Sequence, residues 1–161
     1  MLGGAHFFIG AAIGLSFNNI YTSFLAGIFS HHLLDRLPHL DLNVFESNKY
    51  RNLKDWDLKI WLLVAGEFLF FMIATFYFIK NFDFNLQKIA FLGAIGGIFP
   101  DVFTILIRNC FPNLNIFNFY LNFHKNFHFK LGNKNYLIPI LIELILILLS
   151  ITVFLSFRIN Y

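Results

Sequence analysis

Long apolar stretches constrain the fold of this chain more than any other feature. Residues 58–79 and 136–157 are largely apolar, and each is as long as the roughly 20 residues that a transmembrane helix needs. Residues 88–107 form a third such stretch, which three glycines and Pro100 interrupt. Only 13% of the residues are charged, against about a quarter in a soluble domain. The sequence therefore predicts an all-α integral membrane protein.

The first 35 residues and the segment before the last apolar stretch complete the predicted bundle. Residues 5–17 and 20–35 read as two shorter helices, about 20–24 Å long at 1.5 Å per residue, which would form a tight hairpin. Residues 36–57 read as a polar loop, and residues 118–130 as a helix that is too polar to span and lies at the interface. We expect about five membrane helices, the first two short, plus this interfacial helix, in a single membrane domain over residues 1–161.

Several classes of function have no support in the sequence. The net charge is only +3, and the basic residues do not cluster with aromatic ones in a nucleic-acid pattern. A single cysteine, Cys110, excludes an intramolecular disulfide framework and a multi-cysteine zinc site. The N-terminal segment lacks the basic residues of a cleavable signal peptide and is expected to be mature structure.

Histidines and aspartates gather in short clusters between the apolar stretches. Ionisable groups within hydrocarbon-rich segments are costly and usually functional, and imidazole with carboxylate is a ligand set for zinc or another transition metal. The sequence therefore predicts a divalent metal site, with zinc as the expected ion. Its candidate ligands are His6, His31, Asp35, His39, Asp101, His124 and His128.

A topology of five crossings places all these clusters on one side of the membrane. That side carries nine of the twelve basic residues, namely Arg36, Lys49, Arg51, Lys54, Lys59, Arg108, Lys125, Lys130 and Lys134, and the other side carries Lys80, Lys88 and Arg158. Because cytoplasmic loops are enriched in Lys and Arg, we expect a multi-pass protein of the inner (cytoplasmic) membrane whose site faces the cytoplasm.

Local spacing supports a shared site, although each residue also has a plain structural interpretation. His31 and Asp35 are four residues apart and share a helix face, as do His124 and His128, whereas His32 points about 100° away from His31. Asp35 could instead pair with a nearby basic side chain. Asp101 could cap a helix end, and the two later histidines could form a surface stripe. Glu67 and Glu143 lie mid-membrane, where we expect buried, hydrogen-bonded or protonated groups.

Three motifs of the chain resemble those of the bacterial membrane-bound, predicted metal-dependent hydrolases. They are the opening AHFFIG of residues 5–10, the block AGIFSHHLLDRLPH of residues 26–39, and GAIGGIFPD of residues 93–101. The pattern is also similar, more distantly, to the zinc-dependent phospholipase C helical fold, in which histidines and aspartates from several helices hold metals near a phosphodiester. The segment 124–128 departs from the pattern, because it lacks the Arg and Thr that flank the final histidines of better-known relatives.

The leading hypothesis is a metal-dependent hydrolase that acts at the membrane surface on a phosphodiester or lipid-linked phosphate. Asp35, His39 and Asp101 are its candidate catalytic residues, because a carboxylate or His39 could act as general base. One alternative is a non-enzymatic protein that binds or transports metal with the same ligands. Another is a small structural partner of a larger membrane complex. The sequence leaves the oligomeric state open.

Overall fold

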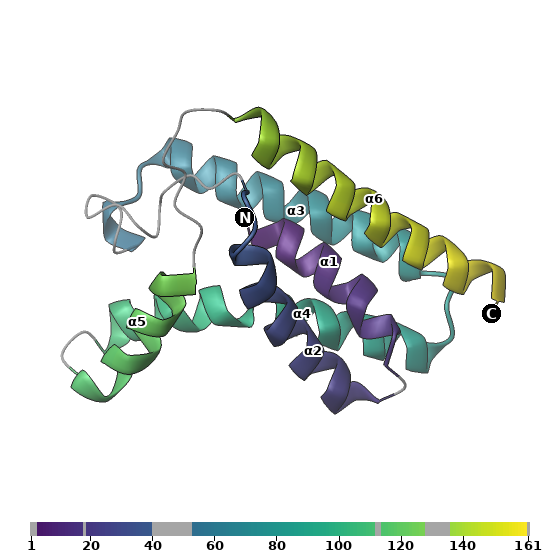
Figure 1. The fold of residues 1–161 in the computed structure, drawn as a ribbon, viewed down its shortest axis with the longest axis horizontal. Coiled ribbons are helices and arrows are strands. Elements are labelled where there is room, and N and C mark those ends of the chain that lie inside the picture. The colour runs from purple at the N-terminus through teal and green to yellow at the C-terminus, as the bar shows by residue number, and fades with distance from the viewer. Residues whose placement is uncertain (1–2, 18, 40–52, 112–113, 128–135, 161) are drawn as a thin grey trace.

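The computed structural model describes residues 3–17, 19–39, 53–111, 114–127 and 136–160 of the chain. Within these residues the fold is all-α, as predicted (Figure 1). The α-helices are α1 (Gly3–Leu15), α2 (Ile20–Asp35), α3 (Leu58–Ile79), α4 (Phe84–Cys110), α5 (Asn118–Phe127) and α6 (Leu137–Asn160), with short 3-10 turns η2 (Leu53–Asp55) and η3 (Asn115–Phe117). Three of them, α3, α4 and α6, are long and apolar enough to cross a membrane.

Capping residues explain where several helices begin. Asn19 caps α2 by accepting a hydrogen bond from the backbone N–H of Tyr21 (2.8 Å), and Asp57 caps α3 by accepting one from Ile60 (2.9 Å). Asp83 does the same for α4, which therefore begins four residues earlier than the apolar stretch predicts. As predicted for residues 88–107, α4 continues through Pro100, and it ends three residues later than expected, at Cys110.

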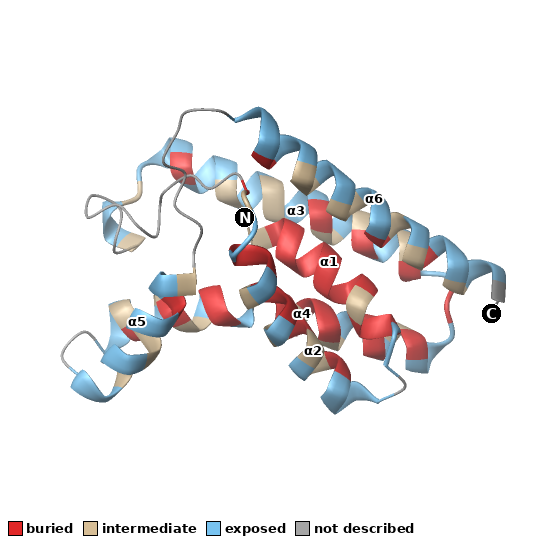
Figure 2. Cartoon of the chain, viewed as in Figure 1, coloured by how far each residue is buried: buried red, intermediate tan, exposed pale blue. Residues whose placement is uncertain are grey.

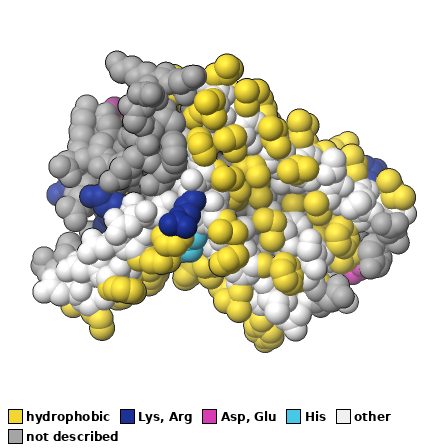
Figure 3. Space-filling view, in the orientation of Figure 1, with side chains coloured by type: hydrophobic (Ala, Val, Ile, Leu, Met, Phe, Trp, Pro, Cys, Tyr) yellow, Lys and Arg dark blue, Asp and Glu magenta, His cyan; other side chains and the backbone are white. Residues whose placement is uncertain are grey.

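Helix α1 lies at the centre of the bundle and is buried on nearly all sides (Figure 2). It packs against α2, α3, α4 and α6. In contrast, α3 and α6 expose apolar side chains along most of their length, and hydrophobic side chains cover much of the face that they form (Figure 3). A buried central helix inside helices with apolar outer faces is the arrangement expected of a bundle in lipid.

Glycines bring α1, α2 and α4 into backbone contact. A Cβ atom added to Gly97 of α4 would meet the backbone carbonyl of His6, and one added to Gly96 would meet the carbonyl of Phe24 in α2. Small residues at a crossing allow two helix backbones to approach this closely. The contact brings together the three helices that carry His6, His31 and Asp101.

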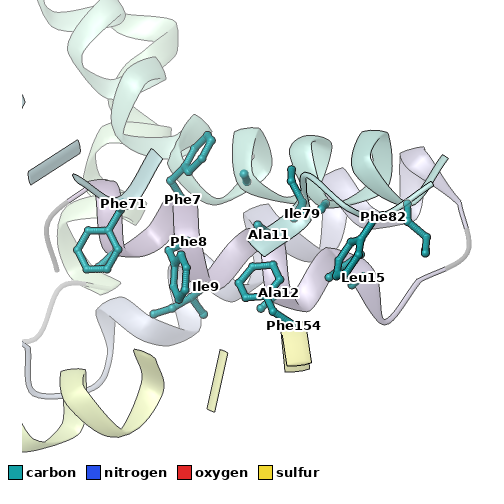
Figure 4. Close-up of a cluster of buried hydrophobic side chains, with 14 of the residues drawn as sticks. Phe7, Phe8, Ile9, Ala11, Ala12, Leu15, Phe71, Ile79, Phe82 and Phe154 are labelled. Carbon is teal, nitrogen blue, oxygen red and sulfur yellow. The ribbon is translucent and has the colours of Figure 1, made fainter. Parts of the chain in front are cut away.

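Large aromatic side chains fill the opposite side of α1. Phe8 of α1 packs against Phe71 of α3 and Phe154 of α6, with ring centroids 5.7 and 5.1 Å apart (Figure 4). Phe154 also stacks on Phe78 of α3 at 5.2 Å. This side of the bundle is therefore held by apolar packing of bulky rings.

Candidate metal centre

Four helices bring ionisable side chains to one buried point. α1 supplies His6, α2 supplies His31 and Asp35, α4 supplies Asp101 and α5 supplies His124. All five side chains are buried, and their relative exposures run from 0% to 6%. The predicted gathering of residues from distant parts of the chain is therefore present in the structure.

Asp35 bridges the Nε2 atoms of His6 and His31. Its Oδ1 is 3.0 Å from His6 Nε2, and its Oδ2 is 3.1 Å from His31 Nε2. The two imidazole rings lie face to face at a tilt, with centroids 4.1 Å apart. One carboxylate therefore fixes the orientation of both rings, and the i, i+4 spacing of His31 and Asp35 on α2 makes this possible.

Asp101 joins this group to α5. Its Oδ1 lies 3.6 Å from His31 Nε2 and 3.5 Å from His124 Nε2. Asp101 follows Pro100, whose carbonyl oxygen accepts a hydrogen bond from the hydroxyl of Tyr120 on α5 (3.0 Å). Burial raises the pKa of the Tyr120 phenol, so the hydroxyl keeps the proton that it donates. Helix α5 is therefore tied to α4 at two neighbouring residues.

The hydrogen bonding of His31 fixes which of its ring nitrogens carries a proton. Nδ1 lies 2.7 Å from the carbonyl oxygen of Gly97, and because a carbonyl can only accept, Nδ1 must be the donor. In a neutral ring Nε2 then carries the lone pair. This Nε2 is buried and faces carboxylate oxygens of Asp35 and Asp101, 3.1 and 3.6 Å away.

A lone pair that faces two carboxylates requires a positive charge between them. A proton, shared between His31 and the aspartates, or a bound cation can supply this charge. A histidine that donates one ring N–H to a backbone carbonyl is oriented to coordinate a metal with its other nitrogen. His6 also has a buried ring nitrogen, Nδ1, without a hydrogen-bond partner in the described part of the chain.

The distances fit a small divalent ion. A tetrahedral ion with bonds of about 2.0–2.2 Å holds its ligand atoms about 3.3–3.6 Å apart. The separations of Asp101 Oδ1 from His31 Nε2 and from His124 Nε2, 3.6 and 3.5 Å, lie in this range. Ligand atoms of His6, His31 and Asp101 all lie within 4.8 Å of one another. Two buried carboxylates and neutral imidazoles would also balance the charge of a divalent cation. These residues could therefore hold a metal ion.

The structure places His32 nearer to this centre than the sequence predicts. Ligand atoms of His31, His32 and His124 form a second group within 4.8 Å. His32 nevertheless points toward α5, where its ring contacts Phe123 and Phe127 edge-on with centroids 5.3 and 5.7 Å away. Since His31 has one ring nitrogen available, it cannot serve both groups at once.

Two of the predicted ligands are not joined to the centre by the described contacts. His39 is buried, and its Nδ1 donates to the carbonyl oxygen of Leu37 (2.7 Å). Among the described residues, the groups of converging ligand atoms do not include it. His128 lies outside the described residues. Membership of the ligand set remains a prediction for both.

Glu67 is hydrogen-bonded, as predicted, and its partners give it a structural role that the sequence did not specify. This residue of α3 accepts hydrogen bonds from the backbone N–H groups of Gly4 (3.0 Å) and Ala5 (2.9 Å) at the start of α1. A carboxylate at a helix N-terminus satisfies donors that have no partner within the helix. His6 follows directly in the chain, so Glu67 fixes the end of α1 that carries it. An acid in the middle of one apolar helix gives no sequence signal that it caps another helix more than 60 residues away.

Comparison of the chain with protein-family models, with curated proteins and with solved structures finds no match.

Proposed function

We propose that this protein is a membrane-embedded, zinc-dependent hydrolase whose centre is formed by His6, His31, Asp35, Asp101 and His124. The observation that carries the proposal is the buried Nε2 of His31, whose lone pair faces two carboxylates while Nδ1 donates to Gly97. Histidine and carboxylate ligands in a site of about 2 Å bond lengths suit zinc. The burial of two carboxylates among apolar helices favours a cation there, because uncompensated charge in such a setting is costly.

The residues of the centre have distinct proposed roles. His6, His31 and Asp101 hold the ion, and His124 of α5 completes the set. When bound, the ion supplies Lewis acidity, which lowers the pKa of water and polarises a phosphoryl or acyl oxygen. Asp35 holds the rings of His6 and His31 in place and is the proposed general base, because its two oxygens lie at the centre of the group.

Phosphodiesters and lipid-linked phosphates are the proposed substrate class. The position of the site among membrane-spanning helices supports this, together with the more distant resemblance to the zinc-dependent phospholipase C fold. The excess of basic residues on the side of the site supports an inner-membrane protein with five crossings, whose centre opens toward the cytoplasm.

Metal content and activity together test the proposal. Protein purified in lipid nanodiscs should contain zinc by elemental analysis and should hydrolyse a phosphodiester until a chelator removes the ion. Asp101→Asn should lose both properties, whereas Asp55→Asn, which alters an exposed acid of η2, should keep both. A wild-type protein that binds no divalent ion would contradict the proposal and would favour a protonated His31. Bound zinc without hydrolysis would favour the non-enzymatic alternative.

A further inference from the structure

Three histidines form a second group of ring nitrogens beside the centre. The ring centroid of His31 lies 5.4 Å from those of His32 and His124, and the last two centroids are 5.7 Å apart. One ligand atom of each residue lies within 4.8 Å of the others. His32 is half-buried, whereas His31 and His124 are buried. We call His31, His32 and His124 the outer group, and His6, His31 and Asp101 the inner group.

The spacing of the three rings in the outer group fits a tetrahedral metal ion. The centroid of a coordinated imidazole lies about 1.2 Å beyond its nitrogen, so with Zn–N bonds of about 2.0–2.1 Å two such centroids are about 5.2 Å apart. The three separations of the outer group, 5.4, 5.4 and 5.7 Å, are close to this value. The rings of His6 and His31 are closer together, with centroids 4.1 Å apart. The outer group therefore needs the smaller movement of its rings to take up an ion.

A buried nitrogen of His32 also indicates a ligand. Its Nδ1 is buried and has no hydrogen-bond partner among the described residues. Phe123 and Phe127 contact the ring edge-on, and their apolar rings offer no partner for this nitrogen. A buried polar atom without a partner is costly. With the ring proton on Nε2, Nδ1 presents a lone pair, which a metal ion would accept.

The two groups can hold one ion in succession but not two ions together. Both need Nε2 of His31, because Nδ1 of this ring donates to Gly97. His124 Nε2 lies 3.5 Å from Asp101 Oδ1, so an ion that exchanges His32 for Asp101 can keep His31 and His124 as ligands. Asp101 adds a negative charge that three neutral imidazoles lack. The inner position is therefore the more stable one for a divalent cation.

We infer that the outer group is a second metal position, which captures the divalent cation and passes it to the inner group. His31 holds the ion throughout, and Asp101 and His6 replace His32 as the ion moves. Because His32 is the most exposed of these ligands, the ion exchanges water for imidazole there first. The inference rests on the proposed zinc centre and adds a second binding position and an order of loading.

Cobalt binding tests the outer position without using catalysis. Cys110→Ser removes the exposed native thiol, and Asp101→Asn removes the carboxylate of the inner group. In this background His32→Cys places a thiolate at the outer position, and excess Co²⁺ should give a thiolate-to-cobalt charge-transfer band in the near ultraviolet, because thiolate is a good ligand for such ions. Leu33→Cys, the next residue of α2 and 49% exposed, is the matched control and should give no band.

The rates of zinc exchange test the order of loading in protein whose inner group is intact. His32→Phe keeps a ring beside Phe123 and Phe127 but removes both nitrogens. Apo protein in nanodiscs should then take up zinc about tenfold more slowly than the wild type. Release to a chelator should slow by a similar factor, because a position that the ion only passes through changes both rates and not the final equilibrium. Phe123→Leu, which alters the same contact but removes no ligand, should not slow uptake.

The outcomes separate this inference from the proposed function. Wild-type uptake by His32→Phe, or faster release with unchanged uptake, would overturn the outer position and leave the zinc centre standing. Absence of the cobalt band from folded His32→Cys protein would do the same. If the Asp101→Asn background does not fold, the exchange rates of His32→Phe decide. A wild-type protein that binds no divalent ion would overturn both the outer position and the proposed function.

Discussion

The two sides of α1 are packed in different ways. Toward α2 and α4, glycines bring the backbones together, and the buried side chains include His6, His31 and Asp101. Toward α3 and α6, phenylalanine rings fill the space, and the contacts are apolar. In lipid, apolar side chains gain little by leaving the solvent, so helices associate through close packing and polar contacts. The side with close backbones is therefore the side that can enclose an ionisable cluster.

The comparison predicts that the glycine side cannot accept even one added carbon. Gly97→Ala should prevent folding or metal binding, because the new Cβ would meet the carbonyl of His6, a backbone atom that cannot rotate away. Gly66→Ala is the matched control on α3, where an added Cβ meets nothing within 4 Å. Thermal unfolding in nanodiscs and zinc content would measure both variants. A Gly97→Ala protein that folds and binds zinc like the wild type would show that α1 and α4 are further apart at this crossing.

The aromatic side should affect stability without affecting the centre. Phe154→Ala removes a fully buried ring and should lower the free energy of unfolding by about 3 kcal/mol. Zinc affinity of the folded fraction should stay within about twofold, because substitutions that share no partners act independently. Unfolding and zinc titration of the same sample would test this. A large loss of zinc affinity would mean that the two sides are coupled through α1.

Asp35 should be needed for metal affinity more than for folding. Asp35→Asn keeps the shape of the side chain but weakens the hold on His6 and His31, so zinc affinity should fall about 10- to 100-fold. Competition with a chelating dye would give the affinity, and Asp55→Asn again serves as the exposed control. An unchanged affinity would exclude Asp35 from the centre.

His31 and His32 should differ although they are neighbours. His31→Ala should lose zinc, because its Nε2 faces both carboxylates, whereas His32→Ala should bind zinc with an affinity reduced about tenfold or less. Zinc content after dialysis would separate the two variants. If both variants lose zinc equally while folded, the group of His31, His32 and His124 would be the better description of the site.

The contact between α5 and α4 should give the smallest effect. Tyr120→Phe removes the hydrogen bond to Pro100, which is worth about 1 kcal/mol, so zinc affinity should fall about fivefold as His124 becomes less well placed. Tyr77→Phe, an exposed tyrosine of α3, is the control and should bind zinc normally. Equal affinities of the two variants would show that α5 does not need this contact.

Much of this arrangement follows from local patterns in the sequence. The length of the apolar stretch predicted a helix over residues 58–79, and α3 has these bounds. The i, i+4 spacing of His31 and Asp35 predicted that they share a helix face, and their side chains are in contact. The patterns also predicted one helix through Pro100, but not its start at Phe84, where Asp83 caps the helix ahead of the apolar stretch.

The patterns also missed the cap that Glu67 provides for α1, since its partners are backbone groups more than 60 residues away. The second group of ligand atoms, His31, His32 and His124, was also missed, because His124 comes from α5, which is distant in the sequence.

The central claim is that a divalent cation satisfies the buried Nε2 of His31. X-ray absorption at the zinc edge of the purified, zinc-loaded protein tests it most directly, because this spectrum reports the ligands themselves. We expect a first shell of about four nitrogen and oxygen atoms at about 2.0–2.1 Å, with outer scattering from at least two imidazoles that is lost in His31→Ala. A spectrum of hydrated zinc without imidazole, or one unchanged by His31→Ala, would contradict the claim.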